Sequence, residues 1–364
     1  MAETWRFIDG GPVDPFANTA RMPIMIKHVL ETGPVLMTSV WGQTHLNVGW
    51  FDDVDSTLDL AACERLGVQV IRRPMYGGGT AFYDEGCAVM CSFLQTKEAA
   101  PDLDEMLSHF QPVYLDALQR LGLGEVQFEG SSDLRWHGRK IGALTGQDIV
   151  AAHSVGSFLN IKPPNLDLYL QVVRVPDDKF KDKVVKDMRE YVVTAQEIAG
   201  REVTYEEYRD ALIGACKDAG MNLADQPFTD EEMATVGRRA QKIADPAYVR
   251  RVSSEKFSAE APAGSRVGFG NHKGRKLCRA GVAIDGSGVI VAAMMAGDMH
   301  VGPPDTMDRV AAALVGAASP DSADLRTRIA SIFEGPDVHQ AEALMGITTD
   351  DLLQAVEKAV ASAH

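Results

Sequence analysis

The chain has 364 residues, of which 45% are hydrophobic and 24% charged, and its formal net charge is −15. This length favours two domains, and the negative charge argues against a nucleic-acid surface, which needs a concentrated basic face. The longest apolar runs are far shorter than the ~20 residues of a membrane span. Residues 1–10 show no basic region followed by an apolar core, so we expect a cytoplasmic protein without a secretory signal.

The first 175 residues mix strand and helix patterns. β-branched runs predict strands at 35–42 and 68–73, and helical spacing of apolar residues between them predicts a helix at 56–67. Residues 80–94 predict a hairpin that turns at Asp84-Glu85-Gly86. These segments predict helices arranged around a sheet.

An amphipathic stripe predicts a helix over residues 102–122, in which Pro112 favours a kink or a break. Strand character returns after it, at residues 125–130, 134–136, 157–161 and 166–175. The whole pattern predicts an α+β domain with a sheet.

Residues 177–250 contain three charged helical patterns. The first ends at Gly200, and the other two open on the N-cap candidates Thr204 and Thr229. Residues 253–274 are rich in Ser, Ala, Gly and Pro and predict a linker or loop. A boundary near 255–270 therefore separates a catalytic domain, 1–255, from a C-terminal domain, 270–364.

The C-terminal domain opens with a hairpin pattern at 276–298, which turns at Asp285-Gly286-Ser287-Gly288. Helical patterns follow at residues 307–316, 321–333 and 348–362. We expect a small α+β unit.

The cysteines give no sign of metal or thiol chemistry. All five are scattered without a CxxC pair: Cys63, Cys87, Cys91, Cys216 and Cys278. No histidine pair accompanies them, and HExxH and GxSxG motifs are absent. The sequence therefore predicts buried thiols and no protein-bound metal.

A triple glycine follows a pair of arginines, and this pattern predicts an anion-binding loop. Gly77-Gly78-Gly79 lets backbone N–H groups approach an anion closely, although the Lys-Ser/Thr pair of a P-loop is absent. Arg72 and Arg73 end a predicted strand and point to opposite faces, so only one of them lines the pocket. A plain tight turn is the alternative.

Lys140 is the candidate catalytic cation. It follows a Trp-His-Gly turn, seven residues after Asp133, and hairpin arms would direct both side chains into one cavity. A lysine beside developing negative charge stabilises that charge electrostatically. An exposed surface lysine is the alternative interpretation.

These two segments, RRPMYGGGTAFYDEG at 72–86 and SDLRWHGRKIGALTGQ at 132–147, resemble the lipoate–protein ligase family of the biotin/lipoate protein ligase superfamily. The matching residues are the arginine pair, the GGG run with Asp84, Asp133-Leu134 and Gly138-Arg139-Lys140. Residues 288–317 are similar to the accessory domain of bipartite ligases. The resemblance implies a mixed-sheet, biotin/lipoyl-ligase-like catalytic domain with a small α+β accessory domain.

The resemblance implies ATP-dependent activation of lipoate or a similar carboxylate, with Mg2+, to an acyl-adenylate. The acyl group then passes to a lysine amine on a lipoyl domain or similar acceptor protein. Lys140 would contact both the acyl carbonyl and the α-phosphate. Binding of substrate and adenylate is expected from Arg72, Arg73, Tyr76, Gly77, Gly78, Gly79, Thr80, Phe82, Asp133 and Gly138.

Three alternatives stay open. Three residues separate Arg73 from Gly77 where the family has two, and residues 146–157 lack arginine, so the carboxylate or the amine can differ from the family's. An octanoyl or lipoyl transferase of the same fold would use a carrier protein without ATP. Such enzymes often use a cysteine, but Cys216 and Cys278, the only cysteines after Lys140, lack an evident activating partner. A non-catalytic homologue is the third alternative.

Overall fold

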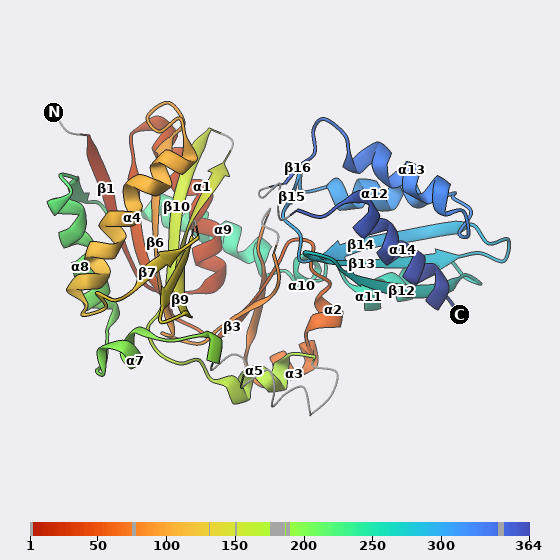
Figure 1. Ribbon diagram of the computed structural model, residues 1–364, viewed down its shortest axis with the longest axis horizontal. Coiled ribbons are helices and arrows are strands. Elements are labelled where there is room, and N and C mark those ends of the chain that lie inside the picture. Colours follow the sequence, from red (N-terminus) through yellow and green to blue (C-terminus); the bar gives the residue numbers. More distant parts are fainter. Residues whose placement is uncertain are drawn as a thin grey trace. The chain divides into compact units, whose positions relative to one another are not determined.

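The protein is described by a computed structural model that covers residues 3–74, 78–130, 132–149, 151–174, 186, 190–340 and 346–364 (Figure 1). Its contacts divide the chain into two compact units. The first comprises Met1–His45, Tyr83–Leu170 and Val175–Ile243, and the second Leu46–Phe82, Gln171–Arg174 and Ala244–His364. The division at 255–270 stays a prediction about which segments fold independently.

An eight-stranded mixed sheet forms the centre of the first unit. Its strands lie in the order β11-β1-β2-β6-β10-β9-β8-β7, with β1 parallel to both β11 and β2 and the other pairs antiparallel. The strands are β1 (Thr4–Val13), β2 (Val35–Trp41), β6 (Ala88–Thr96), β7 (Gln127–Glu129), β8 (Asp133–Trp136), β9 (Arg139–Ile149), β10 (Ala152–Asn160) and β11 (Asn222–Asp225). The predicted α+β class with a mixed sheet is confirmed.

Helices cover both faces of this sheet. Figure 1 shows α1 (Pro15–Glu31) and α9 (Asp230–Ile243) on one face, and α4 (Leu103–Arg120) and α8 (Tyr205–Asp218) on the other. The core beneath α4 and α8 contains stacked rings of Phe93 and Phe110, with Trp5 edge-on to both. Among the described residues, no helix combines the length and hydrophobicity of a bilayer span.

The helix starts follow from side-chain caps. Thr204 and Glu207 form a reciprocal capping box at α8, and Thr229 and Glu232 exchange the same pair of bonds at α9. Asp14 accepts a hydrogen bond from the backbone N–H of Ala17 and so caps α1. The N-caps predicted at Thr204 and Thr229 are confirmed.

The second unit contains two three-stranded sheets. One has the order β4-β3-β5, with β3 (His45–Val48) between β4 (Gln69–Arg72) and β5 (Ala81–Tyr83). The end residues His45 and Tyr83 of this sheet are counted in the first unit. The other is antiparallel, with β13 (Leu277–Ile284) between β12 (Arg266–Lys273) and β14 (Ile290–Gly297). The smaller elements are α2 (Val54–Thr57), α3 (Leu60–Arg65), α5 (Leu166–Val172), α10 (Pro246–Val249), α11 (Ser254–Glu260), β15 (Val301–Gly302) and β16 (His339–Gln340).

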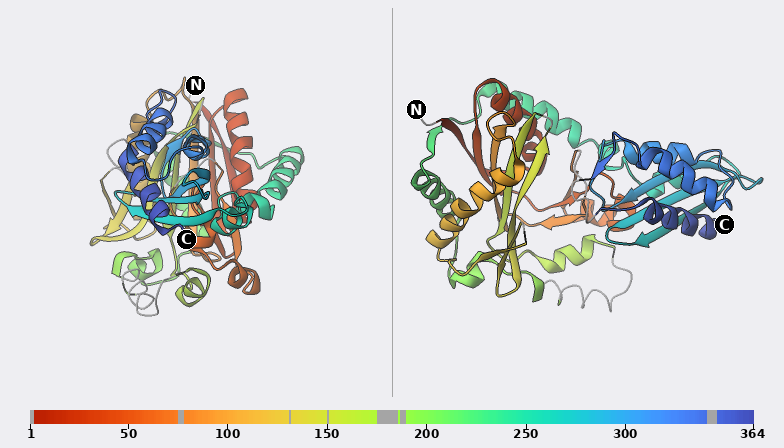
Figure 2. Two further views of the ribbon diagram at one scale, coloured as in Figure 1. Left: turned by 90° about the vertical axis from the view of Figure 1, so that its right-hand side faces the viewer. Right: turned by 45° about the horizontal axis from the view of Figure 1, so that its top comes forward.

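Helices α12 (Thr306–Leu314) and α14 (Thr349–Ser362) pack on the β12–β14 sheet, and α13 (Ser322–Phe333) packs against both of them. All three are drawn in blue in Figures 1 and 2. The predicted hairpin at 276–298 and the three predicted helices are confirmed. Gly268 and Gly270 let β12 pack directly on α14, because a Cβ at either position would lie 2.2 Å from a carbonyl oxygen of that helix.

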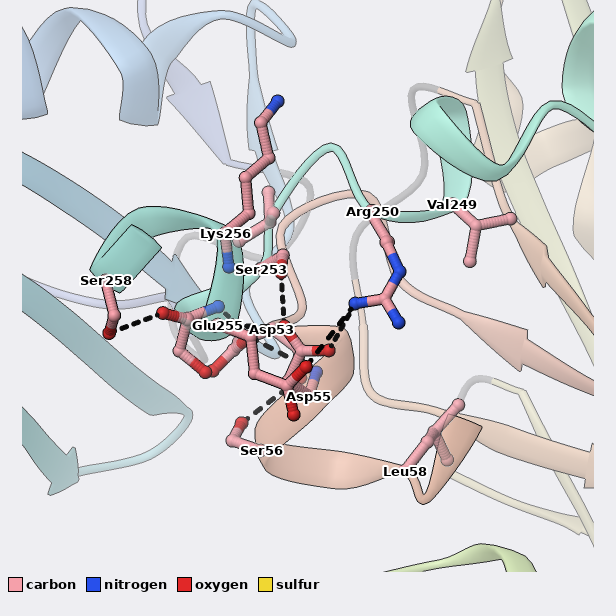
Figure 3. Close-up of polar contacts among 12 residues, drawn as sticks. Asp53, Asp55, Ser56, Leu58, Val249, Arg250, Ser253, Glu255, Lys256 and Ser258 are labelled. Atoms are coloured by element: carbon pink, nitrogen blue, oxygen red, sulfur yellow. Dashed lines mark hydrogen bonds and ion pairs between the residues drawn. The ribbon is translucent and has the colours of Figure 1, made fainter. Parts of the chain in front are cut away.

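Two buried aspartates join separate segments of the second unit (Figure 3). Asp55 accepts hydrogen bonds from the hydroxyl of Ser253, the backbone N–H of Glu255 and the guanidinium of Arg250. Asp53 accepts from the backbone N–H of Ser254 at 2.9 Å. Residues 53–55 thus hold the start of α11 through charge-assisted bonds.

Several sequence predictions are wrong, each for a local reason. The helix expected at 56–67 is split into α2 and α3, because Leu58 is extended and Asp59 caps α3. The strands of the hairpin expected at 80–94 form, but β5 and β6 belong to different sheets. The break considered at Pro112 does not occur, because the helix continues through it as α4, while the kink stays a prediction.

Three further segments differ from expectation. The strand expected at 166–175 is helix α5, whose first turn is capped by Asn165 Oδ1 accepting from the N–H of Leu168 at 3.0 Å. The loop expected at 253–274 contains α11, capped by Ser253, and strand β12. The helix expected up to Gly200 is interrupted, because Val192 forms a β-bridge with Lys140 and Thr194 caps the separate short helix α7 (Ala195–Ala199). Residues 179–185 and 187–189 of that expected helix lie outside the described residues.

Candidate active site

A tight β-hairpin presents Lys140. Trp136 pairs with Arg139 across β8 and β9, which leaves His137 and Gly138 as a two-residue turn. Both have positive φ, 49° and 79°, as a type I′ turn requires. Glycine is favoured at position 138 because of this positive φ. The turn also fixes the position of Lys140, two residues later.

Lys140 is paired with Asp133 across this hairpin. The distance from Lys140 Nζ to Asp133 Oδ1 is 2.6 Å, and both side chains remain about a quarter exposed, at 24% and 26%. The same Nζ lies 5.8 Å from the ring centroid of Phe158 on β10. The ammonium group is thus held in place but stays accessible to a substrate.

Arg135 orients the carboxylate of this pair. Its Nη2 donates to Asp133 Oδ2 at 3.0 Å and to the hydroxyl of Tyr191 at 2.9 Å, while Nη1 donates to the carbonyl of Gly138 at 2.8 Å. Its guanidinium also lies over the ring of Tyr191. Each oxygen of Asp133 therefore faces its own cation, which leaves the carboxylate little freedom to turn.

Arg72 binds backbone groups of the described residues, which indicates a role in folding. It is fully buried, and its guanidinium donates to the backbone carbonyls of five residues: Gly49, Trp50, Asp52, Val249 and Val252. Burial lowers the pKa of Arg72 to about 10, against the opposing charge of Asp52. Of the two neighbouring arginines, this one holds backbone segments of the second unit together.

Arg73 and the described glycines make a compact turn. Arg73 donates to the carbonyls of Asn47 and Gly79, both at 2.8 Å, and the N–H of Gly78 donates to Met299 at 3.3 Å. Gly78 has a φ of +84°, and a Cβ on Gly49 would lie 1.8 Å from the Gly78 carbonyl oxygen. Glycine is therefore needed on both sides of this close approach.

Two further predicted residues of this segment, Thr80 and Phe82, also belong to the second unit. Thr80 donates its hydroxyl to Asp52 at 2.8 Å, and Phe82 lies in β5. Tyr76 and Gly77 lie outside the described residues. The structure brings Lys140 and Asp133 together in the first unit. A shared pocket that joins them to Arg73 and Gly79 stays a prediction.

An aromatic cluster of the first unit was missed from the sequence. Trp41 and His45 have ring centroids 4.4 Å apart, and Tyr83 stacks on His45 at 5.3 Å. Burial lowers the pKa of His45 to about 4, so the ring is neutral near pH 7. A tryptophan at a strand end with a histidine four residues later was the available signal, but that spacing is common.

The cysteines offer no activated thiol. All five are buried, and burial raises the pKa of Cys63, Cys87 and Cys91 to about 11 and that of Cys216 and Cys278 to about 12. A thiolate nucleophile needs the opposite shift. Within the described part of the chain, no group of three His, Cys, Asp or Glu side chains could hold a metal ion.

Comparison with known proteins places these elements in a family. The profile of the lipoyl protein ligase A/B catalytic domain matches residues 14–217. An octanoyltransferase LipM of Geobacillus kaustophilus is 26% identical over 66% of this chain and 95% of its own length. The lipoate-protein ligase LplJ of Bacillus subtilis is also 26% identical, over 63% of this chain and 68% of its own length.

Solved structures share the fold. A bipartite lipoate protein ligase of Thermoplasma acidophilum, 21% identical, has a TM-score of 0.57 and covers 68% of this chain and 96% of its own. LipL1 of P. falciparum, solved in complex with lipoate, has a TM-score of 0.63 at 13% identity and covers 89% of this chain and 94% of its own. The predicted ligase-like fold is confirmed. Because the family profile spans more than half of the chain, this protein belongs to the lipoyl protein ligase A/B catalytic domain family.

Proposed function

We propose that this protein transfers an octanoyl or lipoyl group to the side-chain amine of a lysine on an acceptor protein such as a lipoyl domain. The observation that carries the proposal is the pair of Lys140 and Asp133, 2.6 Å apart and still accessible, within the span of the family's catalytic domain. Relatives named octanoyltransferase and lipoate-protein ligase support the choice of acyl group.

Lys140 supplies positive charge where the reaction develops negative charge. The acceptor amine attacks the acyl carbonyl and forms the amide C–N bond, and the bond to the leaving group breaks as the amine loses its proton. During the attack the carbonyl oxygen gains negative charge. Lys140 has three N–H donors, and Asp133 accepts from one of them, so others can stabilise that oxygen.

The acyl donor distinguishes two versions of this function. The relatives named octanoyltransferase favour a carrier-bound acyl group used without ATP. The five buried cysteines favour the other version, an ATP-dependent ligase, because a transferase that relies on a cysteine nucleophile finds no activated thiol here.

ATP and Mg2+ stay predictions for this chain. At the described glycines, the N–H of Gly78 and a guanidinium nitrogen of Arg73 donate to carbonyls of their own unit. These two donors are therefore engaged within the protein and not with a nucleotide phosphate.

A donor comparison tests the function. The protein is incubated with a lipoyl domain and, separately, with an octanoyl carrier protein, with octanoate and Mg-ATP, or with lipoate and Mg-ATP. We expect mass spectrometry to show acylation of the acceptor lysine with one donor class and none with Lys140→Ala. Acylation from the carrier alone selects the transferase, and acylation only with ATP selects the ligase. An acceptor unmodified by every donor would contradict the proposal.

A further inference from the structure

Helix α1 buries polar atoms that have no hydrogen-bond partner among the residues that the structure describes. Arg21 is 8% exposed, and its Nε and Nη1 are unpartnered, as is Oδ1 of Asn18 one turn earlier. Burial lowers the pKa of Arg21, but a guanidinium stays charged in proteins. The charge of Asp14 acts on this guanidinium, but Nε and Nη1 of Arg21 have no hydrogen-bond partner among the described residues. Because unsatisfied buried donors are costly, these two indicate a binding partner outside the described chain.

Arg21 reaches the sheet where β1 lacks a side chain. A Cβ at Gly10 would lie 3.0 Å from Arg21 Nη1 and 3.2 Å from the Cβ of Ser39 on β2. The carbonyl oxygen of Thr38, 2.7 Å from the same Cβ, also lies there, so glycine is what lets the guanidinium of Arg21 lie against β1 beside Ser39.

A row of paired residues leads from Lys140 to this position. Phe158, over whose ring Lys140 lies, pairs with Met90, and Met90 pairs with Ser39. Directly paired residues point to the same face of a sheet. Asn18 of α1 contacts the sulfur of Met90, so the helix lies over the same row. The row thus runs from the candidate catalytic lysine to the unpartnered arginine.

The length of this row matches a medium-length carbon chain. Phe158 and Ser39 are two strand spacings apart, which amounts to about 10 Å. An extended chain of eight carbons spans roughly 9 Å, because its bonds are about 1.5 Å long and zigzag. An acyl group of this length with its carbonyl at Lys140 therefore ends beside Arg21.

We infer that Arg21 binds an anionic group at the far end of the substrate, which makes the preferred acyl donor a medium-chain α,ω-dicarboxylic acid. The acyl carbon at one end, delivered bonded to its leaving group, forms the amide beside Lys140 as the bond to that leaving group breaks. The free carboxylate at the other end pairs with Arg21 and stays unchanged. This inference rests on the proposed acyl transfer but assigns it an acyl group that differs from octanoyl and lipoyl by a second, terminal carboxylate. Octanoate and lipoate lack the second charge and leave the guanidinium unpaired.

Arg21 also has a structural contact that the test must separate from binding. Its guanidinium lies 5.4 Å from the ring centroid of Phe228, and that of Arg6 lies 5.5 Å from the same ring. A purely structural Arg21 would stabilise the fold. A ligand-binding Arg21 is unpaired in the free protein, so Arg21→Met should keep or raise the melting temperature.

The experiment measures binding of the free acids by calorimetry, so it can be interpreted even if no acyl transfer is found. Octanedioate and octanoate are titrated into the wild-type protein and into Arg21→Met. We expect octanedioate to bind the wild type at least about tenfold more tightly than octanoate, as a charge-assisted hydrogen bond allows. Arg21→Met should abolish this preference and leave octanoate binding unchanged.

Lys27→Gln is the matched control, because it removes a positive charge from the same helix at a side chain that is 71% exposed. It should preserve the preference for octanedioate. Equal affinity of the wild type for both acids, or an unchanged preference in Arg21→Met, would overturn the inference. A lower melting temperature of Arg21→Met with no change in the affinity ratio would assign Arg21 to the structural contact with Phe228.

Discussion

The hairpin around Lys140 and the arginine–glycine segment at 72–80 both carry positive charge, but they use it differently. Lys140, Asp133 and Arg135 bind one another through side chains that are 17–26% exposed. Arg72 is fully buried, and its guanidinium donates to backbone carbonyls. A cation in a conspicuous motif can therefore serve either chemistry or folding, and its hydrogen-bond partners distinguish the two.

Arg72→Met should have the largest effect on stability. It removes the donors to five carbonyls in a buried site, so we expect the free energy of unfolding to fall by about 4 kcal/mol. Urea denaturation measures this. A change below about 1 kcal/mol with loss of transfer activity would assign Arg72 to substrate binding instead.

His45 should make the unit that contains Lys140 sensitive to acid. Its pKa falls from 6.5 to about 4 on folding because burial disfavours the charged ring. The unfolded state therefore binds a proton first, and stability is lost as pH falls from about 6.5 towards 4, by up to about 3 kcal/mol. The free energy of unfolding is measured for the wild type and for His45→Gln between pH 6.5 and pH 4. The variant should lack the loss of stability that protonation of His45 causes. An identical pH profile in the variant would contradict this assignment.

Gly49→Ala should disturb the glycine segment, because the new Cβ would lie 1.8 Å from the carbonyl oxygen of Gly78. We expect a loss of about 2 kcal/mol in unfolding free energy. Gly79→Ala is the matched control, since its Cβ would meet only Asp298, at 3.7 Å. If the control were destabilised as much as Gly49→Ala, close packing would not be the cause.

Tyr191→Phe should have the smallest effect. It removes one hydrogen bond to Arg135, 2.9 Å long, and keeps the ring under the guanidinium. We expect about 1 kcal/mol or less in stability and a decrease in kcat with little change in KM, because Arg135 acts only by positioning Asp133. A rise in KM alone would show that Tyr191 contacts substrate.

Local patterns in the sequence predicted much of the fold and the proximity of two candidate site residues, Asp133 and Lys140. Contacts between residues close in sequence can be recognised from their spacing. Examples are the helix caps at Thr204 and Thr229 and the contact of Asp133 with Lys140. The role of Arg72 depends on carbonyls about 20 and 180 residues away. No local pattern in the sequence reveals partners that far away. The same holds for strand β12, whose glycines pack closely on α14 and had indicated a loop.

The most direct test of the account is the transfer rate of Lys140→Ala measured alongside its stability. Lys140 belongs to a partly exposed ion pair, so its loss should change the free energy of unfolding by less than about 1 kcal/mol. Loss of its charge at the reacting carbonyl should lower kcat/KM by about 100-fold or more with the wild-type donor and acceptor. A folded variant that transfers at the wild-type rate would contradict the account.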